Sequence, residues 1–167
     1  MLVYPDLDSF QEIYCGYAKK HLEPPHNEIV LIVTHYQDIG KVRRNLLAAG
    51  VDVSKYEKKE GSLIILDSVQ SYHANSDHTG VLKLAESLVE KAEREGRTGV
   101  CVFGDIGSFF LFDRVPELLQ YELSIPKRLP IKLKSFCSYH ADDYGKLSNE
   151  EKKILVDNHF RRIQPLN

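Results

Sequence analysis

Four short aliphatic segments divide the chain at fairly regular intervals. The first three are runs of Val, Ile and Leu with almost no polar residue inside, which is typical of strands buried on both faces of a sheet. The fourth alternates apolar residues with charged or polar ones, and so predicts an outer strand with one face partly wet. The four segments are residues 28–36 (EIVLIVTHY), 62–67 (SLIILD), 99–105 (GVCVFGD) and 131–139 (IKLKSFCSY).

Between these segments, hydrophobic residues recur at the spacing of amphipathic helices. They include Phe10, Ile13, Tyr14 and Tyr17; Ile39, Val42, Leu46 and Ala49; and Val81, Leu84, Ala85, Leu88 and Ala92. Ser148 and Glu151 form a capping-box pattern that starts a last helix. Strands that alternate with helices predict parallel strands joined by helical crossovers. We therefore expect an α/β fold, a three-layer sandwich with a mostly parallel sheet and helices on both faces.

The length of the chain and the lack of internal repeats favour a single domain over residues 1–167. Its core is expected to hold the central residues of the strands. These are Val30, Ile32, Ile64, Val100 and Val102.

Composition narrows the class of protein. Hydrophobic residues make up 43% and charged residues 28% of the chain, as in globular proteins. The net charge is -2 and no long run of Lys or Arg occurs, which argues against direct nucleic-acid binding. The longest aliphatic run, residues 29–33, is far too short to cross a membrane. The first ten residues also lack the basic region and apolar stretch of a signal peptide.

Cysteine usage points to a reducing compartment. Cys15, Cys101 and Cys137 are odd in number, far apart and without a CxxC motif, so we expect reduced thiols in a cytoplasmic protein. Cys137 and His140 have the spacing of a zinc-ligand pair, but no second pair would complete four ligands. We expect no metal ion and no cofactor. A Cys–His nucleophilic pair is an alternative that no motif supports.

Polar side chains follow the predicted strands, where parallel sheets bind their ligands. A small-molecule site is therefore expected at the carboxyl ends of the strands. The residues predicted to line it are His35, Tyr36, Asp67, Tyr72, Gly104, Asp105 and Tyr139. Tyr72 belongs to a polar segment, residues 68–77, that is longer than the usual connection and could close over the site as a lid.

The first strand-to-helix turn argues against nucleotide binding. A phosphate-binding loop needs glycines there, so that backbone N–H groups can cradle phosphate, and also a Lys. Residues 34–41 read THYQDIGK, with no glycine upstream of the adjacent Gly40 and Lys41. Asp67 resembles the strand-end acid that holds magnesium in such ATPases, but capping of the next segment is the simpler interpretation. Asp105, between Gly104 and Gly107, is open to both interpretations.

Taken in order, short motifs across the chain resemble one family, the MEDS domain, a sensory domain of the type found in the regulator DcmR of methanogens and methylotrophs. The resemblance runs from about residue 10 to residue 162. It is carried by Gly50, Tyr72, Gly104-Asp105, Tyr121-Glu122, Cys137 with Tyr139, and the closing HFRRI with His159. Two features differ from the family pattern: SFQEIY has no His at the start of the first helix, and Asp105 stands where the family has Glu.

The resemblance implies a sheet of the RecA type and a non-catalytic sensor related to RecA-like ATPases that has lost the phosphate loop. It implies a small-molecule ligand, such as a hydrocarbon derivative, and a signal passed on through a partner protein or self-association. Two other functions remain open from the residues. One is a RecA-like enzyme or ATPase relative that uses Asp67, Asp105 or Cys137, and the other is a scaffold that assembles with a RecA-like partner.

Overall fold

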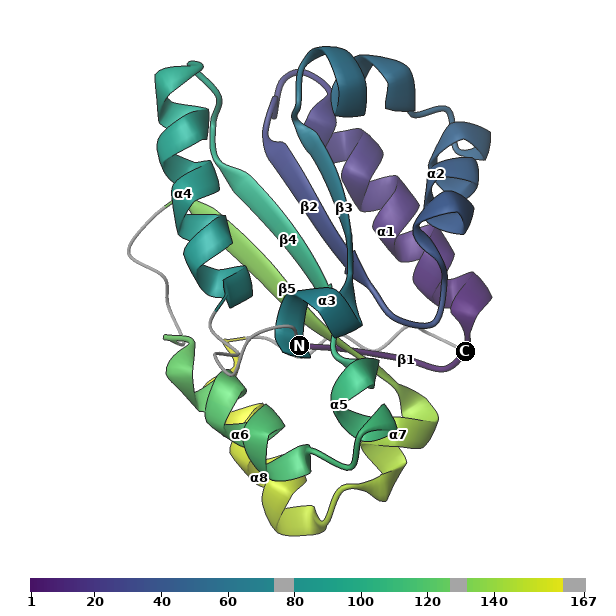
Figure 1. The fold of residues 1–167 in the computed structure, drawn as a ribbon, viewed down its shortest axis with the longest axis vertical. Coiled ribbons are helices and arrows are strands. Elements are labelled where there is room, and N and C mark those ends of the chain that lie inside the picture. The colour runs from purple at the N-terminus through teal and green to yellow at the C-terminus, as the bar shows by residue number, and fades with distance from the viewer. Residues whose placement is uncertain (74–79, 127–131, 161–167) are drawn as a thin grey trace.

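The computed structural model describes residues 1–73, 80–126 and 132–160. Five parallel strands form a single sheet in the order β1-β5-β4-β2-β3 (Figure 1). The strands are β1 (Leu2–Tyr4), β2 (Ile29–Thr34), β3 (Leu63–Asp67), β4 (Val100–Asp105) and β5 (Leu133–His140). The predicted parallel sheet is confirmed.

Helices cover both faces of the sheet and make three layers. One hydrophobic cluster joins α1 and α2 to one face, and a second joins α4, α5, α6, α7 and α8 to the other. The helices are α1 (Leu7–Leu22), α2 (Ile39–Ala48), α3 (Ser68–His73), α4 (Gly80–Arg94), α5 (Gly107–Leu111), α6 (Val115–Ser124), α7 (Ala141–Lys146) and α8 (Asn149–Asn158), with a π-helical turn, η1 (Ser54–Lys59). The capping box of Ser148 and Glu151 starts α8 as expected.

The prediction that the fourth aliphatic segment is an outer strand is wrong. β5 lies between β4 and β1, a strand of three residues that is too short to give a sequence signal. β1 pairs with β5 only from Ser138 to His140. Lys134 and Ser135, in the half of β5 without this neighbour, are exposed, whereas Cys137 to Tyr139 are buried. The exposed polar residues of this segment therefore lie in the half of β5 that β1 does not cover.

Four of the five residues that were predicted to lie in the core are buried. Val30, Ile32, Val100 and Val102 are buried, because β2 and β4 are interior strands. Ile64 is only partly buried. It lies on β3, which forms the opposite edge of the sheet, so fewer neighbours cover it than was expected.

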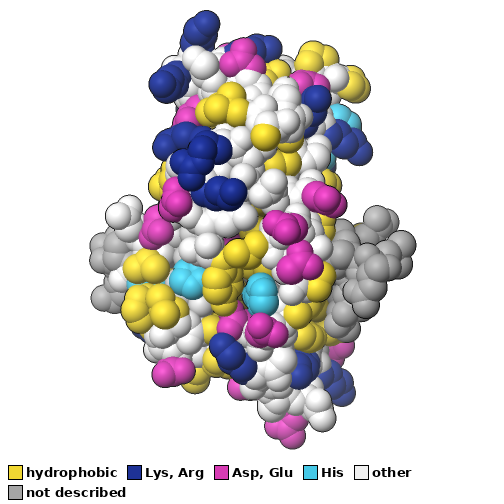
Figure 2. Space-filling model, turned by 90° about the vertical axis from the view of Figure 1, so that its right-hand side faces the viewer, with side chains coloured by type: hydrophobic (Ala, Val, Ile, Leu, Met, Phe, Trp, Pro, Cys, Tyr) yellow, Lys and Arg dark blue, Asp and Glu magenta, His cyan; other side chains and the backbone are white. Residues whose placement is uncertain are grey.

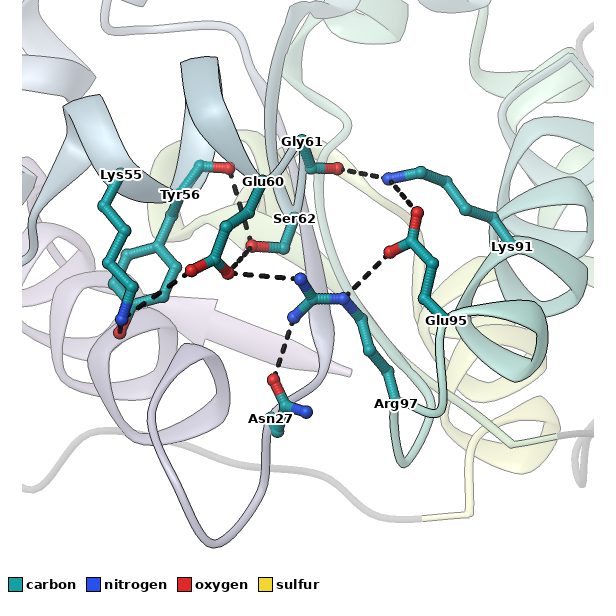
Figure 3. Close-up of polar contacts among 9 residues, drawn as sticks. All are labelled: Asn27, Lys55, Tyr56, Glu60, Gly61, Ser62, Lys91, Glu95 and Arg97. Carbon is teal, nitrogen blue, oxygen red and sulfur yellow. Dashed lines mark hydrogen bonds and ion pairs between the residues drawn. The ribbon is translucent and has the colours of Figure 1, made fainter.

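Polar contacts fasten the amino-terminal end of the sheet (Figure 3). Arg97, whose side chain is 10% exposed, donates to Glu60 Oε2 at 3.1 Å, to Glu95 Oε2 at 3.0 Å and to Asn27 Oδ1 at 2.9 Å. Lys91 Nζ donates to the Gly61 carbonyl at 2.7 Å. These contacts join the turns before β2, β3 and β4, so this end of the sheet is tied by its own side chains.

The surface on the α2 side carries both positively and negatively charged side chains. Lys and Arg side chains lie mainly on its upper part, with Asp and Glu side chains between and below them (Figure 2). Histidine side chains lie near mid-height with hydrophobic side chains between them. Among the residues that the structure describes, no helix is long and apolar enough to cross a bilayer.

Candidate functional site

The carboxyl ends of β2 and β4 meet around Asp105. These strands are neighbours although β3 separates them in the chain, and such a switch in strand order is where α/β sheets bind ligands. Asp105 is 1% exposed. Its carboxylate accepts from the His35 amide at 3.3 Å, the Gly107 amide at 3.1 Å and the Tyr4 hydroxyl at 3.4 Å. We call Asp105, His35 and Tyr36 the strand-end cluster.

Burial dominates the electrostatics of this cluster. It raises the pKa of Asp105 to about 6, although hydrogen bonds from the amides of Gly107, His35 and Tyr36 act in the opposite direction. Burial also lowers the pKa of His35, which favours a neutral imidazole. Near pH 6 the Asp105 carboxyl is therefore partly protonated, beside a largely neutral His35 imidazole.

The polar atoms around Asp105 contact one another. The Tyr36 hydroxyl donates to the Asp143 carboxylate, which also pairs with Lys146 Nζ at 2.6 Å. His35 Nδ1 lies 3.3 Å from the Ser68 hydroxyl, and the rings of His35 and Tyr36 are 4.7 Å apart. Tyr36 keeps 41% of its surface exposed, so it is the accessible member of the cluster.

Two glycines let aromatic side chains close over this end of the sheet. A Cβ at Gly104 would lie 2.7 Å from the Tyr72 hydroxyl, and a Cβ at Gly107 would lie 2.4 Å from the His35 ring. The expectation that Tyr72 belongs to a loop is wrong, because it lies in α3 and is 1% exposed. Residues 74–77 of the expected lid lie outside the described residues.

The structure brings together only part of the predicted site. His35, Tyr36 and Asp105 are in contact, and Gly104 lies against Tyr72. Asp67 Oδ1 accepts from the Gln70 amide at 2.9 Å, so it caps α3 as the simpler interpretation expected. Tyr139 belongs to the hydrophobic cluster on the α4 side, and its hydroxyl donates to Glu122 Oε1 at 2.5 Å. That the seven residues bind a ligand remains a prediction.

A cleft of about 440 Å³ lies along Leu133 to Cys137 of β5, which pair with β4 on one side and, among the described residues, with no strand on the other. We call it the β5 cleft. Its walls come from the start of β1, α1, the end of α6, β5 and the end of α8. The lining side chains are Met1, Tyr17, Ile125, Pro126, Leu133, Phe136 and Phe160, which are apolar or aromatic, and Glu122, Lys134, Ser135, Cys137, Asn158 and His159.

Three potential metal ligands gather in the wall of the β5 cleft. One ligand atom each from Glu122, Cys137 and His159 lies within 4.8 Å of the others. His159 Nε2 is 3.4 Å from Glu122 Oε2. His159 Nδ1 lies 2.7 Å from the Leu155 carbonyl, an acceptor, so Nδ1 carries the proton of that hydrogen bond. Glu122 and Cys137 are 1% and 6% exposed.

Burial shifts the pKa values of two members of this group toward their neutral forms. It lowers the pKa of His159, which opposes the effect of Glu122, and it raises the pKa of the Cys137 thiol well above its ordinary value. The pKa of Tyr139 is also raised well above its ordinary value by burial, so its hydroxyl donates to Glu122. The Met1 amino group lines the same cleft, and its positive charge acts to lower the pKa of Cys137 and of His159.

Cys137 and His140 do not form the pair that was considered from the sequence. They are three residues apart on one strand, so their side chains point to opposite faces of the sheet. The His140 ring packs edge-on against Tyr4, 5.3 Å away, on the α1 side. Sequence reasoning missed Glu122 and His159 as partners of Cys137. The signal was present, since both belong to the motifs that carried the family resemblance.

One family comparison matches most of the chain. The model of the MEDS domain, described as the methanogen/methylotroph, DcmR sensory domain, matches residues 1–150. The matched segment includes Glu122, Cys137 and Tyr139, and His159 follows it. No curated protein matches the chain.

Proposed function

Because the chain belongs to the MEDS family of sensory domains, we propose that it senses a small, mainly apolar molecule with one polar group, bound in the β5 cleft. The observation that carries the proposal is the lining of this cleft, where apolar walls meet Glu122, Cys137 and His159. Ligand sites commonly combine an apolar lining with a few convergent polar groups, in volumes of roughly 300–1,000 Å³. A hydrocarbon derivative has this chemistry.

The strand-end cluster is the second location for such a ligand. Its switch-point position favours it, and Tyr36 is accessible there. Against it, the carboxylate of Asp105 already accepts three hydrogen bonds from the protein, and Tyr72 fills the space beside Gly104. A ligand would have to displace these contacts, whereas the described residues around the β5 cleft leave about 440 Å³ of space.

The same geometry disfavours the ATPase alternative. Asp67 and Asp105, its proposed acids, both accept hydrogen bonds from backbone amides of their own chain. The amino terminus of α2, where a phosphate would bind, is capped by the Asp38 carboxylate, which accepts from the Lys41 amide at 2.8 Å. A negative side chain at this position would repel a phosphate group.

The signal is proposed to pass to a partner protein or to a second copy of the chain in the cytoplasm. Leu123 on α6, Ile154 and Val156 on α8, and Phe160 are exposed hydrophobic side chains. α6 and α8 lie side by side (Figure 1). Residues of both helices line the β5 cleft. A ligand in the cleft could therefore alter the surface that these helices present. Light scattering with and without ligand would show self-association.

A fluorescent probe tests the location of the site. The chain has no Trp, so the emission of added 8-anilinonaphthalene-1-sulfonate can be followed cleanly. The protein is first treated with a chelator to remove any bound metal ion. We expect the probe to bind this protein, and 1-hexanol or hexanoate to displace the probe. Phe160→Ala should weaken probe binding at least about fivefold, which corresponds to about 1 kcal/mol.

Phe112→Ala is the matched control, because Phe112 is a similarly exposed phenylalanine that does not line the β5 cleft. It should bind the probe like the unmodified chain. If Tyr36→Ala weakens binding and Phe160→Ala does not, the ligand binds at the strand-end cluster instead. A chain ending at Phe160 should bind equally well, and a large gain of affinity on this truncation would mean that residues 161–167 compete for the cleft.

A further inference from the structure

We propose that Glu122, Cys137 and His159 bind a divalent transition-metal ion, with Zn²⁺ the best match to their chemistry. A thiolate, an imidazole and a carboxylate are the three ligand types that zinc takes in proteins. They come from β5, α6 and the residue after α8, so the fold assembles them from distant parts of the chain. The inference does not depend on the proposed function, since the three side chains could hold an ion whether or not the cleft takes an organic molecule.

The distances suit an ion after a small adjustment. Around a tetrahedral zinc, bond lengths of about 2.0–2.3 Å put neighbouring ligand atoms roughly 3–4 Å apart. His159 Nε2 and Glu122 Oε2 are already 3.4 Å apart, and all three ligand atoms lie within 4.8 Å. Side-chain movement of about one ångström would therefore bring all three ligand atoms within bonding distance of one ion.

The hydrogen bonds that the three proposed metal ligands make resemble those of the second coordination shell of a metal site. A metal-bound histidine usually donates its other N–H to a carbonyl or carboxylate, which fixes the ring and its tautomer. Here His159 Nδ1 donates to the Leu155 carbonyl, so Nε2 is the atom left to face Glu122. The Tyr139 hydroxyl holds the other carboxylate oxygen, Glu122 Oε1. Both contacts leave Nε2 and Oε2 facing each other, in a cleft whose wall also carries the Met1 amino group.

The β5 cleft gives the ion access and an open coordination position. All three ligands line the cleft, which is about 440 Å³. With three protein ligands, the fourth position would take water or a polar group of a bound molecule, as in zinc sites that are not purely structural. On binding, the Cys137 thiol loses its proton to solvent and its sulfur donates an electron pair to the ion.

A second group of potential ligands, His21, His26 and Glu28, is a weaker candidate and serves as a comparison. Glu28 is already held by His21 Nδ1 at 2.6 Å and by Lys134 Nζ at 2.5 Å. An ion there would have to displace the Lys134 ammonium. No thiol belongs to this group, so its spectrum with cobalt would differ from that of the Cys137 site.

Cobalt(II) titration of the full chain, after treatment with a chelator, tests the proposal. We expect one Co²⁺ per chain, a near-ultraviolet thiolate-to-cobalt charge-transfer band, and intense visible bands of four-coordinate cobalt. Zn²⁺ should abolish these bands by displacement. Cys137→Ser should remove the charge-transfer band, and His159→Asn should weaken binding at least about 100-fold. Tyr139→Phe should weaken it about 10–100-fold, the usual effect of losing an outer-shell partner.

Matched variants separate this site from others. Cys101→Ser changes a buried thiol in β4, His140→Asn changes a histidine on the opposite face, and His26→Asn changes the second group. All three should leave the cobalt spectrum unchanged. The proposal is overturned if folded, unmodified protein gives no charge-transfer band, or if the band survives in Cys137→Ser. Because this titration contains no organic ligand, its failure is distinct from failure of the probe experiment.

Discussion

The strand-end cluster and the β5 cleft both gather polar side chains, but they use them differently. At the strand ends, the carboxylates of Asp105 and Asp143 are matched by donors from the protein, and aromatic rings close the space over Gly104 and Gly107. In the β5 cleft, His159 Nε2 faces Glu122 Oε2 beside open space. The two regions therefore differ in the space beside their polar atoms, although both gather polar side chains.

Loss of the Tyr72 side chain is expected to have the largest effect, because it tests whether the strand-end region is packed. Tyr72 is 1% exposed and its ring contacts Phe109 and Tyr121 at centroid distances of 5.3 Å. Tyr72→Ala should lower the free energy of unfolding by about 3–5 kcal/mol. Urea denaturation followed by circular dichroism measures this. A loss below about 1 kcal/mol would mean that the region is open, as a ligand site would be.

A methyl group added at Gly107 tests the same packing from the other direction. Its Cβ would lie 2.4 Å from the His35 ring and 2.8 Å from the Tyr36 ring. Gly107→Ala should therefore cost about 1–3 kcal/mol of stability, the usual range for overpacking. Thermal denaturation of Gly107→Ala beside Gly145→Ala, where nothing lies within 4 Å of the added atom, gives the comparison. Equal melting temperatures would show that His35 and Tyr36 move aside easily.

The buried carboxyl of Asp105 predicts a pH dependence of stability opposite in sign to that of His159 in the β5 cleft, whose pKa burial lowers. The pKa of Asp105 is raised to about 6 in the folded chain, so the protonated form is favoured by folding. Its contribution to stability is complete below the unfolded pKa and is lost as pH rises through about 6. Each unit of pKa shift corresponds to about 1.4 kcal/mol.

Asp105→Asn keeps the shape of the side chain but cannot ionise. Relative to this variant, the unmodified chain should lose a few kcal/mol of stability between about pH 4 and pH 7. Urea denaturation at several pH values measures the difference. A constant difference across this range would contradict the raised pKa. His159→Asn provides a comparison from the β5 cleft.

The smallest effect on stability is expected in the β5 cleft itself. Phe160 is 56% exposed, so Phe160→Ala should change the free energy of unfolding by less than about 0.5 kcal/mol. The same substitution should weaken probe binding, as described above. Chemical denaturation beside the fluorescence titration separates the two readouts. A large loss of stability would place Phe160 in the core and remove it from the cleft.

The sequence by itself determined the layers of this protein. Aliphatic runs such as IVLIVT have almost no polar position to turn toward water, so these strands were expected to have helices on both faces. The runs did not give the strand order, because the equally aliphatic β3 lies at an edge. It also predicted that Asp67 caps the following segment, because that contact is local and depends only on neighbouring residues. The short motifs that carried the family resemblance identified the family over residues 1–150.

Only the tertiary structure decided which of these residues meet. β1 has three residues, too few for a pattern, yet its length sets how much of the β5 edge stays open. Glu122, Cys137 and His159 lie far apart in the chain and share no spacing that a local rule could detect. Their convergence depends on how α6 and α8 pack beside β5. Contacts between distant elements depend on how the faces of helices and strands pack together. A single sequence indicates only which residues of each face tend to be buried, and not which faces meet.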